Sequence, residues 1–98
     1  MTDARSRDLE FNLTVEYLWQ LFEEQAGKCA LSGLPISFGA TTKDRDATAS
    51  LDRKDSTLGY VTGNVWWVHK EINFMKGTLP LSRFIDYCTK ISLLSHLP

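Results

Sequence analysis

The chain has 98 residues, of which 43% are hydrophobic and 11% aromatic, which is enough to bury the core of one small domain. No stretch approaches the about 20 consecutive apolar residues needed to cross a bilayer, and the N-terminus lacks the apolar segment of a secretory signal. Two cysteines are too few for a disulfide scaffold. We therefore expect one cytoplasmic domain with both cysteines as thiols and no membrane partner.

The net charge of −1 argues against binding to nucleic acid by overall charge alone, but the charge is uneven. Residues 1–27 hold two arginines and six acidic residues, whereas residues 28–98 hold nine Lys or Arg and six acidic residues, a net charge of +3. That excess suits a phosphate backbone as partner. It is weak evidence by itself, because surface charge varies this much among proteins of any function.

The N-terminal part predicts an arm followed by a helix. Residues 1–12 are polar and charged without a sustained period, so we expect a flexible arm. Thr14 can cap a helix for which Gly27 is the stop signal. The apolar residues at i, i+3, i+4 and i+7 of this helix are Val15, Leu18, Trp19 and Phe22. This stripe predicts a face that docks on the core of the chain itself rather than on a partner.

The middle of the chain predicts turns and short strands. A tight turn is expected at Ser32-Gly33, followed by a short strand, and residues 39–48 are expected to form a loop because they are small, polar and charged. Residues 49–51 and 64–68 predict two strands joined by a glycine-containing loop.

Two helices are predicted in the last third. Helical spacing returns with Ile72 and Met75 and stops at Gly77. After Pro80, apolar residues recur at helical spacing at Leu81, Phe84, Ile85, Cys88 and Ile91. The expected fold is therefore α+β, a small single domain in which a ββα unit at about residues 48–77 is flanked by N- and C-terminal helices.

Adjacent tryptophans place a constraint on the hairpin. Trp66 and Trp67 must point to opposite faces of a strand, so both faces of the hairpin should be covered. The predicted core residues are Trp19, Phe22, Trp66 or Trp67, Phe84 and Ile85.

Several short segments of the second half occur at a spacing that is hard to obtain by chance. They are Ser50 to Arg53, Gly59-Tyr60, Asn64-Val65, Trp67-Val68, Asn73 and Lys76-Gly77. In this spacing the chain resembles the HNH endonucleases, which are ββα-metal (His-Me finger) nucleases. It is most similar to the phage and mobile-element subset that has Asp-Arg in place of Asp-His. The resemblance extends over roughly residues 13–91 and implies an HNH-like nuclease domain over residues 13–98.

The resemblance implies a divalent-metal-dependent endonuclease that hydrolyses or nicks DNA, in a bacterial host cell or encoded by a phage, with duplex DNA as its partner. It places Asp52 and Asn73 at the metal-ligand positions and Asn64 at the position that braces the loop and orients the base. Phosphodiester hydrolysis needs a cation to neutralise the phosphoryl oxygens. A carboxylate and an amide oxygen suit one Mg²⁺ or Mn²⁺ ion with several waters retained.

Arg53 occupies the position of the family's general-base histidine. A guanidinium with a pKa above about 12 cannot accept a proton near neutrality, but it can hold a phosphate. The proton acceptor is then Asp55, His69, Tyr60, solvent or a hydroxide formed on the metal. The alternative is a catalytically inactive HNH-fold module that binds DNA or a protein partner.

The resemblance also bears on zinc. In zinc-carrying HNH proteins two pairs of ligands staple the hairpin, and the matching positions here are Cys29 with Ser32 and His69 with Ile72. Because serine and isoleucine are not zinc ligands in such sites, we expect no structural zinc. This correspondence places His69 near the first pair, at the end of the hairpin away from the metal.

Three lysines join Arg53 as candidate phosphate contacts, namely Lys54, Lys70 and Lys76. Lys76 is the strongest of them because it belongs to the family's Asn-x-x-Lys-Gly ending. One ββα site addresses one strand at a time, so a double-strand cut would need a homodimer or a second encounter.

Overall fold

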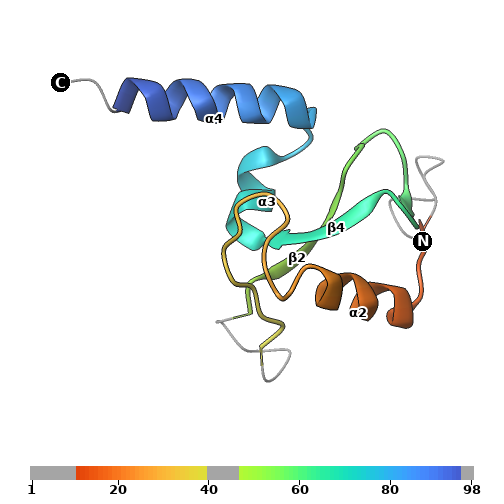
Figure 1. Ribbon diagram of the computed structural model, residues 1–98. Helices are drawn as coiled ribbons and strands as arrows, with labels where there is room; N and C mark the ends of the chain where they lie inside the picture. Colours follow the sequence, from red (N-terminus) through yellow and green to blue (C-terminus); the bar gives the residue numbers. More distant parts are fainter. Residues whose placement is uncertain (1–10, 40–46, 96–98) are drawn as a thin grey trace.

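The computed structural model describes residues 11–39 and 47–95. Within them the elements follow in the order β1 (Phe11–Asn12), α2 (Val15–Glu24), β2 (Ala49–Arg53), β3 (Tyr60–Val61), β4 (Val65–His69), α3 (Lys70–Lys76) and α4 (Leu81–Ser95). They make a small α+β domain with three helices and two two-stranded sheets in the described ranges (Figure 1). The expected α+β class is confirmed. Most of the predicted arm and of the predicted loop at 39–48 lies outside the described residues.

The hairpin of β2 and β4 is the centre of the domain. The two strands are antiparallel, with Ala49 opposite His69 and Arg53 opposite Val65. Trp66 Nε1 donates a hydrogen bond to Asp52 on the face toward α3, whereas Trp67 Nε1 donates to the Leu18 carbonyl of α2. The prediction that both faces are covered is therefore confirmed, with α3 on one face and α2 on the other.

The first helix begins and ends at the predicted signals. The Thr14 hydroxyl accepts a hydrogen bond from the Tyr17 amide at 3.0 Å, and beyond Glu24 a positive φ at Ala26 and Gly27 turns the chain out of the helix.

The docking face of α2 is narrower than predicted. Val15 is 77% exposed and Trp19 is 52% exposed. The helix nevertheless contacts the hairpin along its length. The Tyr17 hydroxyl accepts a hydrogen bond from the Gly63 amide, the Leu18 carbonyl accepts one from Trp67 Nε1, and the Gln25 side-chain amide at the C-terminal end exchanges two with the Trp67 backbone. Phe22 lies beside this end, with its ring 4.6 Å from that of Phe38.

The turn after α2 is present, but the strand expected to follow it is not. The Cys29 amide donates to the Leu34 carbonyl, and Gly33 adopts the positive φ of 75° that the turn requires. Only an isolated bridge between Lys28 and Pro35 follows among the described residues. Pairing does not extend, because the Gly27 amide donates to the Phe22 carbonyl and the Leu34 amide donates to the Ser32 hydroxyl instead of to the opposite segment.

A pair of very short strands was not predicted. Phe11–Asn12 pairs in parallel with Tyr60–Val61, and the Phe11 and Tyr60 rings lie 5.5 Å apart. The chain is thus attached to the domain from Phe11 onward, two residues before the predicted end of the arm.

The core is smaller and placed differently from the prediction. The buried apolar side chains in the described ranges are Cys29, Ile36, Val65, Val68 and Phe84. Phe84 was expected there, but the placement of Trp19 and Ile85 in the core is wrong, since both are about half exposed.

The last two helices match their predicted limits. Gly77 ends α3 with a φ of 56°, and α4 begins directly after Pro80. Figure 1 shows α4 extending away from the hairpin, and Phe84 is its only buried residue. In the described ranges, no helix combines the length and the hydropathy that a membrane span requires.

Candidate functional site

The interface between β2 and α3 contains a buried ion pair. Asp52 is 5% exposed and Lys76 is 2% exposed, and the Lys76 Nζ atom lies 3.1 Å from Asp52 Oδ1. Trp66 Nε1 donates to the other carboxylate oxygen, Oδ2, at 2.9 Å. Both oxygens of the carboxylate therefore have a partner within the chain.

Asn73 lies beside this ion pair, one helical turn before Lys76. Its side-chain nitrogen is 2.7 Å from the Ser50 hydroxyl oxygen. Because alternate strand residues share a face, Ser50 and Asp52 point to the same side of β2, and residues three apart on α3 meet them. The structure thus brings Asp52, Asn73 and Lys76 together. Neither Ser50 nor Trp66 was predicted to lie at the site, although strand alternation and hairpin register could have placed both there.

The donor chemistry of this interface suits a hard cation such as Mg²⁺ or Mn²⁺. Asp52, Asn73 and Ser50 offer a carboxylate, an amide and a hydroxyl oxygen, and Mg²⁺ needs only one or two carboxylates when it keeps several waters. The Lys76 ammonium, however, already balances the Asp52 charge. A divalent cation on Asp52 would have to displace that ammonium. Across residues 11–39 and 47–95, no three His, Cys, Asp or Glu side chains cluster to bind a metal.

Asn64 joins the β2–β3 loop to the start of β4. Its side chain is buried, with Oδ1 accepting a hydrogen bond from the Asp55 amide at 3.0 Å. Its Nδ2 donates to the Asp55 and Gly59 carbonyls at 3.1 and 2.8 Å. The Asn64 side chain therefore holds both the beginning of this loop, at Asp55, and its end, at Gly59.

Arg53 is directed into that loop. Its Nη1 atom donates to the Ser56 and Leu58 carbonyls at 3.0 and 3.1 Å, and its guanidinium lies 5.1 Å from the centre of the Tyr60 ring. Neighbouring strand residues point to opposite faces, so the Arg53 and Asp52 side chains diverge. In this conformation Arg53 binds the protein's own loop.

Asp55 lies in the same loop and is exposed. Its Oδ1 atom accepts hydrogen bonds from the Thr57 hydroxyl at 2.6 Å and from the Thr57 amide at 2.9 Å. The hydroxyl first, and the amide second, lower the pKa of Asp55 below its ordinary value of 3.8. A lower pKa makes Asp55 a weaker proton acceptor.

His69 is not brought to Asp52. It lies three residues along β4 from Trp66, the partner of Asp52, which is about 10 Å along the strand and on the opposite face. Its Nδ1 atom accepts a hydrogen bond from the Glu71 amide at 3.1 Å and so caps α3. The prediction that His69 could accept the proton of the attacking water is therefore corrected, because its ring lies too far from Asp52.

His69 instead lies beside Cys29, at the end of the hairpin where the sequence placed it. Burial raises the pKa of the Cys29 thiol, but hydrogen bonds outweigh that effect, so the pKa is lowered overall. The donors are the Ser32 side chain and the backbones of His69, Leu31 and Ser32.

The candidate phosphate contacts differ in accessibility. Lys54 is exposed, with its ammonium 5.1 Å from the centre of the Trp66 ring, and Lys70 is exposed at the start of α3. Lys76, favoured by the sequence, is buried against Asp52 and cannot reach a phosphate in this conformation. The prediction that Lys76 contacts DNA is therefore corrected: Lys76 is the buried counterion of Asp52.

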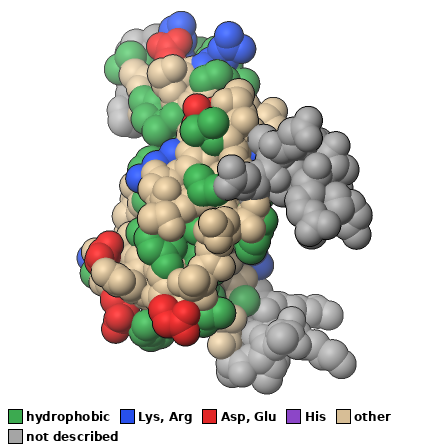
Figure 2. Space-filling view, turned by 90° about the vertical axis from the view of Figure 1, so that its right-hand side faces the viewer, with side chains coloured by type: hydrophobic (Ala, Val, Ile, Leu, Met, Phe, Trp, Pro, Cys, Tyr) green, Lys and Arg blue, Asp and Glu red, His purple; other side chains and the backbone are tan. Residues whose placement is uncertain are grey.

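Surface charge is segregated in the way that the sequence indicates. Figure 2 shows acidic side chains gathered at the lower end of the molecule, at the height of α2 in Figure 1. The exposed acidic residues of that helix are Glu16, Glu23 and Glu24. A polyanion would therefore be repelled from the α2 end of the domain.

The chain was compared with protein families, solved structures and curated proteins. No protein-family model matches the chain, and no solved structure matches it. The chain is 30% identical over 83 residues to an uncharacterized 29.0 kDa protein in the dda-modA intergenic region of Enterobacteria phage T4. The matched segment covers 85% of this chain but only 31% of the phage protein, so the chain spans about a third of that relative's length.

Proposed function

We propose that this chain is a divalent-metal-dependent DNA endonuclease that hydrolyses or nicks phosphodiester bonds. The observation that carries this proposal is the contact between β2 and α3, where Asn73 bonds to Ser50 and Lys76 to Asp52, and where the helix follows the hairpin directly. A hairpin followed by a helix is also the order that the resemblance of the sequence to the HNH endonucleases leads us to expect, which supports the proposal. The similarity to a phage protein supports a phage or bacterial-host setting.

Asp52 and Asn73 are the residues that would hold one Mg²⁺ or Mn²⁺ ion, with the Ser50 hydroxyl beside them. When bound, the ion would supply positive charge for the phosphoryl oxygens and polarise a water. The Trp66 indole fixes the orientation of the Asp52 carboxylate. Lys76 balances the charge of that carboxylate when no ion is present.

The proton of the attacking water goes to bulk solvent in this proposal. Arg53 cannot accept it, His69 is at the far end of the hairpin, and the pKa of Asp55 is lowered by Thr57. Asn64 holds the loop next to Asp52, so the residues that approach the DNA backbone keep a fixed position. Lys54 and Lys70 are the exposed cations that would contact phosphates.

A supercoiled-plasmid assay with Mg²⁺, Mn²⁺ or EDTA tests the proposal. We expect metal-dependent relaxation of the plasmid, reduced about 100-fold or more by Asp52→Asn and about tenfold or more by Asn73→Ala. Asp86→Asn is the matched control, because Asp86 is an exposed carboxylate paired with Lys90 on α4. The site assignment fails if no metal supports cutting or if Asp52→Asn cuts as fast as the wild type.

A second candidate function is a non-catalytic module that binds DNA or a protein partner. Two contacts favour it. Lys76 already binds the Asp52 carboxylate that would hold the metal, and Arg53 donates its hydrogen bonds to the loop of the protein itself. Metal-independent DNA binding without cleavage would support this function. Metal-dependent cutting of DNA would rule out this second function.

A further inference from the structure

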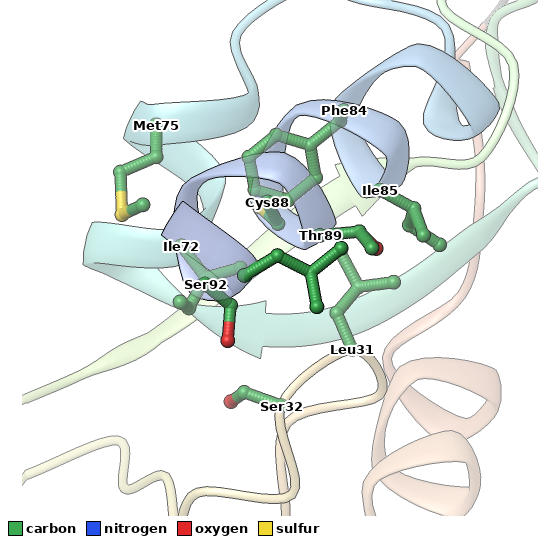
Figure 3. Close-up of a pocket in the computed structure, with 10 residues that line it drawn as sticks. Leu31, Ser32, Ile72, Met75, Phe84, Ile85, Cys88, Thr89 and Ser92 are labelled. Carbon is green, nitrogen blue, oxygen red and sulfur yellow. The ribbon is translucent and has the colours of Figure 1, made fainter. Parts of the chain in front are cut away.

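The largest groove of the domain does not suit a phosphate. It has a volume of about 490 Å³ and lies between the turn after α2, α3 and α4 (Figure 3). Apolar side chains, hydroxyls and one thiol line it, with no charged side chain among them. A nucleic acid presents negative charges, which an uncharged surface cannot neutralise. The charged groups lie instead on the side of β2 that faces α3.

Three side chains share that side of β2. Ser50, Asp52 and Lys54 alternate along the chain, and the Lys54 amide donates to the Asn64 carbonyl at 2.8 Å, which continues the pairing with β4 by one residue. Side chains of α3 bond to the first two of the three. The helix ends at Lys76, so Lys54 lies past its last turn and is exposed.

The Trp66 indole contacts both Asp52 and Lys54. Its Nε1 atom donates to Asp52 Oδ2 at 2.9 Å, and the Lys54 ammonium lies 5.1 Å from the centre of its ring. The face of an indole attracts a cation, so it restrains a lysine side chain that would otherwise change rotamer freely. Among the described residues no carboxylate pairs with Lys54, so its charge is available to a ligand.

The other candidate cations lack this combination of features. Arg53 points to the opposite face and donates to its own loop, and Lys76 is buried. Lys70 begins α3 at the opposite end of the hairpin. Lys54 is both exposed and next to Asp52 on the same face of the strand.

We propose that Lys54 binds the phosphate group that is hydrolysed at Asp52, and that Trp66 is a positioning residue that holds the lysine and the carboxylate side by side. This inference rests on the proposed function. A phosphodiester brings a negative charge of its own, and the charge on its oxygens changes as the bond breaks. An ammonium fixed beside those oxygens stabilises the charge without having to reorganise.

Binding of a dye-labelled DNA duplex in EDTA, followed by fluorescence anisotropy against salt concentration, tests the phosphate contact without cleavage. We expect Lys54→Gln to weaken binding about five- to tenfold at about 0.1 M salt and to reduce the salt slope by about one, the share of one phosphate contact. Lys90→Gln is the control, because Lys90 is 70% exposed on α4, and it should bind as the wild type does. Equal affinities for the two variants would overturn the proposal.

Two variants of Trp66 separate the ring from its N–H group. Trp66→Leu removes both, so binding in EDTA should weaken about two- to fivefold. Trp66→Phe keeps a ring for the ammonium and should bind nearly as the wild type does, although it loses the bond to Asp52 and should cut more slowly. Because Trp66→Leu could also weaken binding by loosening the fold, its effect is measured again in Lys54→Gln, where it should disappear. An effect that persists there would overturn the positioning role.

Cleavage kinetics with Mn²⁺ distinguish the phosphate that is hydrolysed from its neighbours. In Lys54→Gln we expect kcat to fall about tenfold or more with a smaller rise in KM, and Lys54→Arg should restore part of the rate. A rise in KM alone would mean that Lys54 contacts a neighbouring phosphate, which overturns the proposal. If no metal supports cutting, the proposed function fails and the role of Lys54 in hydrolysis fails with it. The binding measurements in EDTA succeed or fail independently of that result.

Discussion

Lys76 places its ammonium 3.1 Å from the Asp52 carboxylate inside the β2–α3 interface, and these two side chains are only 1% and 6% exposed. A lone lysine or aspartate at this depth would be strongly unfavourable, because each charge has lost its water. The pair is therefore a unit, and removing either partner should be much worse than removing both.

Replacement of Lys76 alone should destabilise the fold. Lys76→Met leaves Asp52 buried beside a single indole donor, and we expect a loss of about 3 to 5 kcal/mol in the free energy of unfolding. Urea denaturation measures this loss. The double variant Asp52→Asn, Lys76→Met should recover part of it, and the exposed control Lys90→Met should change stability by less than about 1 kcal/mol. A change below that limit for Lys76→Met would show that the ion pair is not needed.

Metal binding should compete with the Lys76 ammonium. If Asp52 is a ligand, Lys76→Met removes the competing cation, so Mn²⁺ should raise the melting temperature of Lys76→Met by more than it raises that of the wild type. The effect should vanish in Asp52→Asn, Lys76→Met, which has no carboxylate at the site. Differential scanning fluorimetry against Mn²⁺ concentration gives both values. Equal shifts in all three proteins would place any metal elsewhere.

Asn64 should control the order of the loop after Asp52. Asn64→Ala leaves the Asp55 amide and the Gly59 carbonyl without their partner, and we expect a loss of about 2 to 3 kcal/mol. Hydrogen exchange at the Asp55 amide should become about tenfold faster or more. Asn64→Asp is a sharper comparison, because it keeps the acceptor for Asp55 and loses both donors. Unchanged exchange in Asn64→Ala would contradict the bracing role.

Replacing Arg53 by the histidine that HNH endonucleases carry at the matching position should lower the proposed nuclease activity rather than raise it. Arg53→His loses the two bonds to the Ser56 and Leu58 carbonyls and the contact with Tyr60, so the loop would loosen. We expect a loss of about 1 to 2 kcal/mol in stability and slower plasmid nicking. Arg53→Lys keeps the positive charge but not the shape of the guanidinium, so it separates the effect of the charge from that of the hydrogen bonds to the loop. Faster cutting by Arg53→His would instead mean that the wild type lacks a base.

The lowered pKa of Asp55 can be tested by titration of its carboxyl group. The Thr57 hydroxyl is the larger cause, so Thr57→Val should raise the pKa of Asp55 toward 3.8, as followed by NMR titration of the carboxyl carbon. A group whose pKa is depressed in the folded state stabilises it above the unfolded pKa. That contribution is lost as the pH falls through the folded pKa. An unchanged titration in Thr57→Val would assign the shift to another group.

Elements with local signals were predictable from the sequence. Thr14, Gly77 and Pro80 each act through neighbouring residues, so the limits of three helices follow from capping and from proline chemistry. The hairpin follows from two short strands around a glycine loop. The approach of Asn73 to β2 follows once the hairpin and the helix are joined.

Features that depend on distant contacts were not predictable. The two-residue strand at Phe11 pairs with Tyr60, which no local pattern indicates. A lysine is expected at the surface, and the burial of Lys76 depends on Asp52, 24 residues away. Trp19 and Ile85 have core spacing on their helices, but no other part of the described chain packs against them closely enough to bury them, and each stays about half exposed.

The hydrogen bond from Trp66 to Asp52 gives the protein an optical reporter at the proposed site. The emission of an indole depends on what its N–H binds and on the charges nearby, and both would change if a divalent cation replaced an ammonium on Asp52. Variants with Trp19 and Trp67 replaced by phenylalanine would isolate this signal. Occupancy of the carboxylate could then be read in solution without DNA and without a catalytic assay.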